Sequence, residues 1–430
     1  MDNTQAESPV AKSAIRKIAV RLVPFVALMF FINYLDRTAI GFASPNGMND
    51  DLALSAAQFG FASGVFFIGY ILLEVPSNLA LHKFGARRWL ARIMVSWGIV
   101  ALLFTWVQNF EQLVVLRFLL GVAEAGFLPG VLLYLTQWYP DARRARIVAL
   151  FMVGLPLSSM IGSPISGWIM AFFNGAHGLG GWQWLFLLEA LPSIALGIAI
   201  LAWLPNNIES ARWLSAAEKK TLRANLDAEP SGNKSHSLSG AFVDFKVWAL
   251  GLIDLCVLLG LYATSFWLPS ILRDTGVADP YHIGWLMAIP NALAVLSTLY
   301  CGASSDRMRE RRWHIVVPFL VAAVALVIAG SGHHGTVATV ILFSLINAGA
   351  AAAMPVVWSL PSTFLKGPAA AAGIAFACSI ANLGGFGSTY FIGWLRDTFH
   401  SQSAGLFGFA ACMIVGCTLA LTYSAKLVNR

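Results

Sequence analysis

Residues 21–41 read RLVPFVALMFFINYLDRTAIG, an apolar run that carries Asp36 and Arg37 near its end. About 20 apolar residues are enough to cross a bilayer as a helix. Charged side chains inside such a span are costly, and they mark functional sites by default. The stretch therefore predicts a membrane-spanning helix with a functional site inside it.

The composition of the chain predicts a membrane protein built from helices. Of its 430 residues, 58% are hydrophobic and 11% are charged, whereas soluble domains carry about 25% charged residues. The apolar runs are long and continuous, unlike the short alternating segments of a membrane barrel. Because lipid admits only helices and closed barrels, we expect an all-α membrane protein.

The net charge of +7 does not indicate a nucleic-acid partner, because the basic residues cluster in short loops between apolar runs. Such clustering is typical of membrane topology. The five cysteines lie within or at the ends of apolar runs and show no metal-binding or disulfide spacing. We expect no cofactor and no metal.

Twelve apolar runs are long enough to be spans. They cover about residues 18–43, 56–80, 88–107, 111–137, 145–173, 182–204, 245–271, 281–303, 313–330, 336–362, 368–395 and 402–425. With the N-terminus in the cytoplasm, only Arg273 and Arg396 fall in outer loops, and Arg37 and Arg117 fall within spans. This bias predicts that both termini are cytoplasmic in the cell (inner or plasma) membrane.

The spans divide six plus six. A cytoplasmic tail (1–17) precedes an N-terminal six-helix bundle (18–204), a polar linker (205–244) follows, and a C-terminal six-helix bundle (245–425) leads to a short tail (426–430). Within the linker, Ser210 to Leu226 can form a surface helix. The halves echo one another: the RRW ends of LHKFGARRW (81–89) and SDRMRERRW (305–313) are 224 residues apart, and the Gly-Trp pairs of ISGWIM and FIGWLR are 226 apart. Internal repeats of this kind indicate a secondary transporter with a site between the halves.

Seven ionisable residues lie inside the spans. Arginine suits a substrate carboxylate because its planar fork binds bidentately, and buried acids suit proton carriage. The alternative is that these charges form static salt bridges, and that Glu189 and Asp254 are structural. The seven are Asp36, Arg37, Glu74, Arg117, Glu124, Glu189 and Asp254.

Depth along the spans brings the two arginines together. Arg37 lies near the outer end of span one, and Arg117 lies near the outer end of span four, so both can share a level. Glu124 is two turns beyond Arg117 on the same helical face, and the intervening Gly121 leaves room for a neighbouring helix. We expect ionised Asp36 and Glu124 to pair with Arg37 and Arg117, and protonation to release the arginines for an organic anion.

The second half holds almost no buried charge, so it is expected to shape the wall of the substrate site. Aromatic and polar residues in its spans are the candidates: Tyr262, Trp267, Trp358, Ser379 and Asn382. Tyr34 in the first span is a further candidate. Glu74, nearer the cytoplasmic end, is expected to act as a gate or a loop anchor.

Several motifs together resemble the major facilitator superfamily, and within it the anion:cation symporter family. They are NYLDRTAIG, FFIGYILLEVPSNL, GARRWLARIMVSWGIV, RFLLGVAEAGFLPGVLLYLTQWYP, GWQWLFLLEALP and SDRMRERRWH. The resemblance covers nearly the whole chain and implies two pseudo-symmetric six-helix bundles. It also implies proton-coupled import of a small organic carboxylate such as a hydroxy, sugar or aromatic acid.

The resemblance implies roles for particular residues. It places coupling and anion binding on Asp36, Arg37, Arg117 and Glu124, and substrate contacts on Tyr70 and Asn382. The loop motif of the superfamily, Gly-x-x-x-Asp-Arg, is intact at Gly302, Asp306 and Arg307. The matching loop after span two departs from it, with Asn78 at the glycine position and His82 at the aspartate position.

Other functions remain as alternatives. GLPLSSMIGSPISGW (154–168) is similar to the pattern of drug–proton antiporters, so a proton antiporter or exporter of the same fold is the main one. A membrane enzyme is disfavoured because the histidines lie in loops or at span ends, including GHHG (332–335), and no HExxH or GxSxG occurs. A channel is disfavoured by the repeat and the paired charges. The expected partners are an organic anion, protons and the bilayer, with the chain acting as a monomer.

Overall fold

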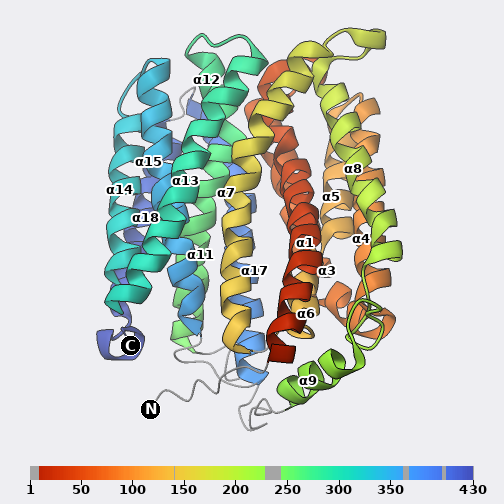
Figure 1. Ribbon diagram of the computed structural model, residues 1–430. Helices are drawn as coiled ribbons and strands as arrows, with labels where there is room; N and C mark the ends of the chain where they lie inside the picture. The colour runs from red at the N-terminus through yellow and green to blue at the C-terminus, as the bar shows by residue number, and fades with distance from the viewer. Residues whose placement is uncertain (1–8, 140, 228–243, 362–367, 400–402, 430) are drawn as a thin grey trace.

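The computed structural model describes residues 9–139, 141–227, 244–361, 368–399 and 403–429, which form a bundle of long helices (Figure 1). In this part of the chain, ten helical segments are long and apolar enough to cross a membrane. The 32-residue helices α7 and α17 occupy the two remaining predicted spans. The predicted all-α fold is confirmed.

The helices of the N-terminal half are α1 (Pro9–Ala43), α3 (Ala56–Phe84), α4 (Ala86–Leu103), α5 (Phe110–Glu124), α6 (Phe127–Thr136), α7 (Asp141–Phe172) and α8 (Gly181–Trp203). Those of the C-terminal half are α11 (Phe245–Tyr262), α12 (Leu268–Asp274), α13 (Pro280–Met308), α14 (Trp313–Gly330), α15 (Thr336–Ser359), α17 (Pro368–Phe399) and α18 (Ser403–Thr422). Shorter elements are η1 (Ser44–Met48), α2 (Asn49–Asp51), α9 (Ala216–Asp227), η4 (Ala263–Trp267) and α19 (Ala425–Val428).

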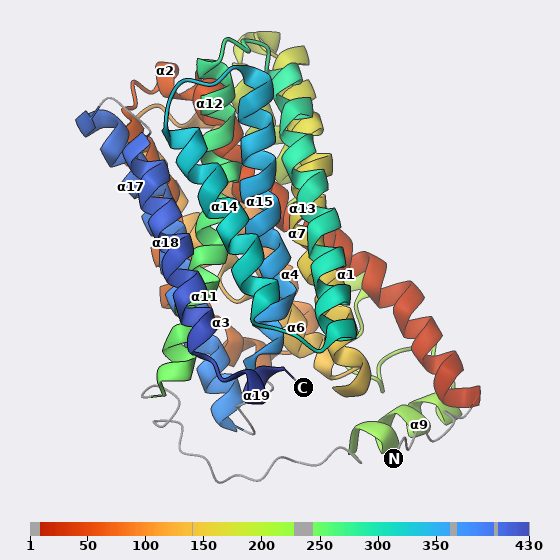
Figure 2. The same cartoon turned by 90° about the vertical axis from the view of Figure 1, so that its left-hand side faces the viewer.

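The two halves lie side by side, with the N-terminal half on the right of Figure 1 and the C-terminal half on the left. They meet where α7 packs against α13 and where α3 packs against α17. We call the end of the bundle that carries the start of α1, α9 and α19 the proximal end. The opposite end, which carries α2 and α12, is the distal end (Figures 1 and 2).

Glycines let the backbones of the two halves touch near the distal end. A side-chain carbon added to Gly393 of α17 would lie 2.2 Å from the carbonyl oxygen of Ala56, where α3 begins. A carbon added to Gly167 of α7 would lie 2.5 Å from the carbonyl oxygen of Pro280, where α13 begins. Real side-chain carbons do not approach backbone this closely, so a larger residue at either position would force the halves apart.

The alanine variant Gly393→Ala is therefore expected to lower the thermal unfolding midpoint of the purified protein in detergent. Overpacking of a tight contact costs about 1–3 kcal/mol. Gly387→Ala on the same helix is the matched control, because a carbon added there meets nothing within 4 Å, and alanine favours helix more than glycine does. Equal midpoints for the two variants would contradict this account of the contact.

Polar contacts also join the halves at the distal end. The Asp397 carboxylate of α17 accepts hydrogen bonds from the backbone N–H groups of Ala56 at 3.2 Å and Ala57 at 2.8 Å, in the first turn of α3. Arg273 of α12 donates from Nη1 to Asn46 Oδ1 at 3.1 Å. Backbone packing and hydrogen bonds thus hold the distal end closed.

At the proximal end, α1 begins at Pro9, ahead of the predicted start of the first span, and docks on α9. Ser13 Oγ and Lys17 Nζ donate to the Glu218 carboxylate at 2.8 and 2.9 Å. Glu218 also accepts from the backbone N–H of Ser215 at 2.8 Å, which fixes the start of α9. The surface helix expected from Ser210 to Leu226 is present as α9, but it begins later, at Ala216, and ends at Asp227. Residues 228–243 of the predicted linker lie outside the described residues.

The hydrogen bond from Lys17, with that from the Ser215 N–H, lowers the pKa of Glu218 from 4.5 to about 2. A lowered carboxyl pKa stabilises the ionised folded form, so this contribution is present above about pH 4.5 and is lost as the pH falls toward about 2. We expect Glu218→Gln to release α9 at neutral pH and to speed tryptic cleavage there. Glu209→Gln, at an exposed side chain before the helix, should leave the cleavage rate unchanged, and equal rates for both variants would exclude the docking role.

The fourth predicted span is interrupted, contrary to the continuous helix expected over 111–137. Helix α5 ends at Glu124, Ala125 is extended with ψ of 132°, and Gly126 has φ of +81°. That φ favours glycine, and a side-chain carbon at Gly126 would lie 2.5 Å from Ser77 Oγ. The break places Glu124 at the C-terminal end of α5.

Candidate functional site

Arg37 and Glu124 form a buried ion pair between α1 and α5. The Arg37 Nη2 group bonds to Glu124 Oε1, and Arg37 Nη1 donates to the Tyr262 hydroxyl of the C-terminal half at 3.4 Å. The Glu124 side chain is 1% exposed and that of Arg37 is 12% exposed. This buried pair therefore connects the two halves.

Arg117 lies close to this pair, and both arginines contact the ring of Phe66 of α3. Each guanidinium carbon is 5.0 Å from the centre of the Phe66 ring, a cation–π arrangement. Arg117 is buried, and its Nη2 donates to the backbone carbonyl of Ser63 at 3.0 Å. Its Nε has no hydrogen-bond partner, and no ion pair to Arg117 is seen among the described residues. Because both arginines contact the same ring, they lie close together, as their depth in the spans predicted.

Asp36 does not pair with either arginine, which differs from the expected pairing. It is buried between helices of the N-terminal half, where it accepts hydrogen bonds from Trp97 Nε1 at 2.8 Å and from Ser193 Oγ. Successive residues on a helix point about 100° apart. Asp36 and Arg37 therefore face different neighbours, although they are adjacent in the sequence.

Three residues predicted for the N-terminal half gather around Arg37. The Arg37 guanidinium lies 5.2 Å from the centre of the Tyr70 ring. Glu74, one turn beyond Tyr70 on α3, is close enough to interact electrostatically with Arg37. Tyr34 is buried on α1 and interacts with the side chains of Ser159 and Ser265.

The predicted wall residues of the C-terminal half lie on α11, where Tyr262 contacts Arg37, and on η4, α15 and α17. Trp267 is buried in η4, and its ring meets that of Phe59 of α3 edge to face at 5.4 Å. Trp358 on α15, and Ser379 and Asn382 on α17, are partly buried. The indole Nε1 groups of Trp267 and Trp358 are buried without a hydrogen-bond partner.

The loop motif holds the turn between α13 and α14. Asp306 forms an ion pair with Arg311 at 2.6 Å, and Arg311 Nη1 donates to Ser305 Oγ at 2.9 Å. Gly302 faces Pro355 of α15, and Arg307 is exposed. His82, at the departing position of the first loop, has no described side chain.

Phe66 was not among the residues predicted from the sequence. Its spacing in the sequence could have indicated a place in the site. Phe66 lies three residues after Ser63 and four before Tyr70, so it shares one face of α3 with both. An aromatic residue at such a spacing is more often part of an apolar core. Its contact with both arginines depends on how α1, α3 and α5 pack, which the sequence alone does not reveal.

Comparison with known proteins places this arrangement in a family. The family model of the Major Facilitator Superfamily matches residues 26–386. A putative metabolite transport protein, NicT of Pseudomonas putida, is 51% identical over 421 residues, covering 97% of this chain and 96% of that protein. A putative tartrate transporter of Agrobacterium vitis is 44% identical over 419 residues, with the same coverage of each chain. A quinolone resistance transporter of Acinetobacter baumannii is 37% identical over 423 residues, again covering 97% and 96%.

Among solved structures, a bacterial homologue of the human lysosomal transporter Spinster, in an inward-facing and occupied conformation, has the same fold. Its TM-score is 0.75 at 15% identity, covering 96% of this chain and 97% of that one. The match of the family model and the identity to the transporters, together with the buried arginine and carboxylate cluster between two helical halves, support one conclusion. This chain is a multi-pass secondary transporter, not an enzyme, and belongs to the major facilitator superfamily, to its anion:cation symporter type.

Proposed function

We propose that this protein imports a small organic carboxylate together with protons, as a monomer in the cell membrane with its proximal end in the cytoplasm. The observation that carries the proposal is Arg117, a buried guanidinium for which the described residues provide a backbone carbonyl but no carboxylate. A buried charge without a counter-ion is costly. A substrate carboxylate would supply the missing partner in a bidentate geometry.

The proton would act through Glu124. While Glu124 is ionised, Arg37 has an internal partner. Protonation removes that charge, and the site then carries an excess of positive charge from Arg37 and Arg117. The negative charge of a carboxylate substrate compensates this excess. The two halves of the loaded protein can then move relative to each other, from the outward-open to the inward-open arrangement. Loss of the proton to the cytoplasm re-forms the pair of Arg37 and Glu124 and displaces the anion.

Tyr70, Tyr34, Trp267, Trp358, Ser379 and Asn382 would form the substrate wall. The unpaired indole N–H groups of Trp267 and Trp358 suit hydroxyl or carboxylate oxygens. The name of one relative, a putative tartrate transporter, supports a hydroxy acid as the first substrate to test. Glu74 would serve as a gate, because it reaches Arg37 from the proximal side.

Uptake of radiolabelled tartrate, and of sugar and aromatic acids in parallel, into proteoliposomes tests the proposal. An acidic exterior should drive accumulation of at least one acid, and a protonophore should abolish it. Saturable uptake that does not respond to the pH gradient would contradict proton coupling.

Export by proton antiport is the second candidate, and the quinolone resistance transporter among the relatives favours testing it. An antiporter would accumulate its substrate when the vesicle interior is acidic. Importing and exporting modes therefore respond to opposite pH gradients. Vesicles of known protein orientation, right-side-out and inverted, separate the two.

A further inference from the structure

An open groove lies on the outer face of the C-terminal half, toward the proximal end, and the proposed function does not use it. Its volume is about 470 Å³. Helices α13 and α14 form its sides and both pack against α15, but they hardly pack against each other. Figure 2 shows the three helices on the face turned to the viewer. The floor of the groove consists of small, buried residues of α15: Ala348, Gly349 and Ala352.

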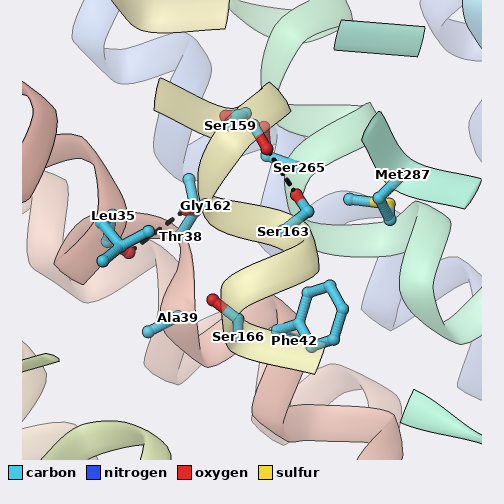
Figure 3. Close-up of a pocket in the computed structure, with 10 residues that line it drawn as sticks. All are labelled: Leu35, Thr38, Ala39, Phe42, Ser159, Gly162, Ser163, Ser166, Ser265 and Met287. Carbon is cyan, nitrogen blue, oxygen red and sulfur yellow. Dashed lines mark hydrogen bonds between the residues drawn. The ribbon is translucent and has the colours of Figure 1, made fainter. Parts of the chain in front are cut away.

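The groove is large enough for an organic ligand, whereas a second cavity is not. That cavity lies between α1, α7, η4 and α13, and Figure 3 shows Ser159, Ser163 and Ser166 of α7 along its wall. Its volume is about 10 Å³, room for about one water molecule. Pockets that bind small organic ligands measure about 300–1,000 Å³. Of these two cavities, the groove is therefore the candidate for a further binding site.

The length of the groove matches one leaflet of a bilayer. Along α13 its lining extends from Ser297 to Met308, which is about 16 Å of helix at a rise of about 1.5 Å per residue. The hydrocarbon core of a bilayer is about 30 Å thick, so one leaflet contributes about 15 Å. Met308 is the last residue of α13, and all three helices are long and apolar enough to cross a membrane. The groove therefore runs from the proximal membrane surface to about the middle of the bilayer.

The wall of the groove is apolar, because several of its polar side chains bond within the protein. Ser297 Oγ donates to the backbone carbonyl of Ala348 at 2.9 Å. The His314 Nε2 atom and Ser304 Oγ share a hydrogen bond at 3.0 Å. A wall of this kind fits a hydrocarbon chain better than a polar metabolite. The exposed large side chains along its sides are Tyr300, Met308, Trp313, Val317 and Val321.

Positive charge gathers where the groove opens at the proximal end. Arg307 follows Ser304 by three residues and Tyr300 by seven, which places it on the groove face of α13, one turn nearer the proximal end. Arg309 lies in the turn that follows α13. Both arginines are exposed, and neither has an ion pair with the residues that the structure describes. Arg312, by contrast, donates to a backbone carbonyl of α18.

The acidic residues of the same turn already have partners. Asp306 forms an ion pair with Arg311 at 2.6 Å. Glu310 accepts a hydrogen bond from the backbone N–H of Trp313 at 2.9 Å and lies 2.9 Å from His314 Nδ1. The mouth of the groove therefore carries an excess of positive charge. Arginine clusters at a membrane surface attract anionic lipid headgroups, and tryptophan is enriched at the level of those headgroups.

We propose that this groove binds one anionic phospholipid from the leaflet at the proximal end. An acyl chain lies between α13 and α14 on the floor formed by α15, and the phosphate lies at Arg307 and Arg309. The planar guanidinium of arginine suits phosphate, because it can bind two oxygen atoms at once. A helix from another protein is too large for the groove, since one turn of a helix about 10 Å across and 5.4 Å long fills roughly 400 Å³. The bound lipid links α13 to α14 where the protein leaves them apart.

Native mass spectrometry of the delipidated protein in detergent tests the headgroup contact. The protein is titrated with dioleoyl phosphatidylglycerol or with dioleoyl phosphatidylcholine, which has the same chains and no net charge. We expect tight binding of one phosphatidylglycerol and weaker binding of phosphatidylcholine. Arg307→Gln and Arg309→Gln should each weaken the binding of phosphatidylglycerol about fivefold and leave that of phosphatidylcholine unchanged. Arg16→Gln, at an exposed arginine near the start of α1, is the matched control and should change neither.

Filling the groove tests the contact with the acyl chain. Val317→Trp places a large side chain in the groove from an exposed position, 52% accessible, and should abolish the binding of both lipids. Val324→Trp is the matched control, because Val324 lies seven residues further along the same face of α14, is 59% exposed and does not line the groove. Phosphatidylglycerol should also raise the thermal unfolding midpoint of the wild type, and Val317→Trp should remove that increase.

Three results would overturn the proposal. The first is equal binding of the two lipids by the wild-type protein, and the second is phosphatidylglycerol binding that Val317→Trp does not change. The third is a dimer in the mass spectrum that Val317→Trp dissociates, since the groove would then belong to an interface with a second copy.

Discussion

Glutamine in place of Glu124 is expected to abolish accumulation of substrate driven by a pH gradient. The amide cannot carry a proton, and it leaves Arg37 without its charged partner. An imposed gradient of one pH unit is worth about 1.4 kcal/mol per proton, or about tenfold accumulation. In Glu124→Gln the internal and external substrate concentrations should instead become equal.

Exchange of labelled for unlabelled anion should survive in the same variant. Exchange needs no net proton movement, and Arg37 and Arg117 both remain available to the anion. Glu111→Gln is the matched control, since Glu111 is exposed in the first turn of the same helix. Continued accumulation by Glu124→Gln would remove Glu124 from the coupling mechanism.

Substitution of Arg117 is expected to have the largest effect on substrate binding. Loss of one partner from a buried, hydrogen-bonded charge pair costs about 2–5 kcal/mol, which is on the order of 30- to 5,000-fold in affinity. Arg117→Gln should show this loss in the dissociation constant for the transported acid. Arg117→Lys keeps the charge without the planar fork, so its affinity should fall between those of the wild type and the glutamine variant.

The control for the Arg117 variants is a variant that removes a positive charge far from the site. Lys220→Gln changes an exposed residue of α9 and should leave the affinity unchanged. Gel filtration establishes that each variant is folded and monodisperse before binding is measured. A folded Arg117→Gln protein with wild-type affinity would show that the anion does not bind at this guanidinium.

The spans and the buried charges could be predicted from the sequence because each has a strong local signal. Continuous apolar runs indicate spans, and a charge inside a run is rare enough to draw notice. The level shared by Arg37 and Arg117 followed from counting residues at the rise of a helix. Each of these predictions needs only the sequence and the length of a single helix.

The contacts between side chains could not be predicted in the same way. Asp36 and Arg37 are adjacent in the sequence, which suggested a shared cavity, yet the helix turns them toward different neighbours. The break after Glu124 depends on the left-handed backbone of Gly126, and glycine in a span is equally compatible with an unbroken helix. Predicting which side chains contact each other therefore requires knowing how several helices pack together.

The contact between Asp397 and the first turn of α3 bears on how fast the carrier can cycle. A carboxylate at the positive pole of a helix dipole contributes about 0.3–1 kcal/mol when it is near the surface, little more than thermal energy. In the import cycle proposed above, this contact has to break and re-form once in every turnover. A contact of this strength can favour the conformation in which the distal end is closed, and its breakage would not limit the rate of transport.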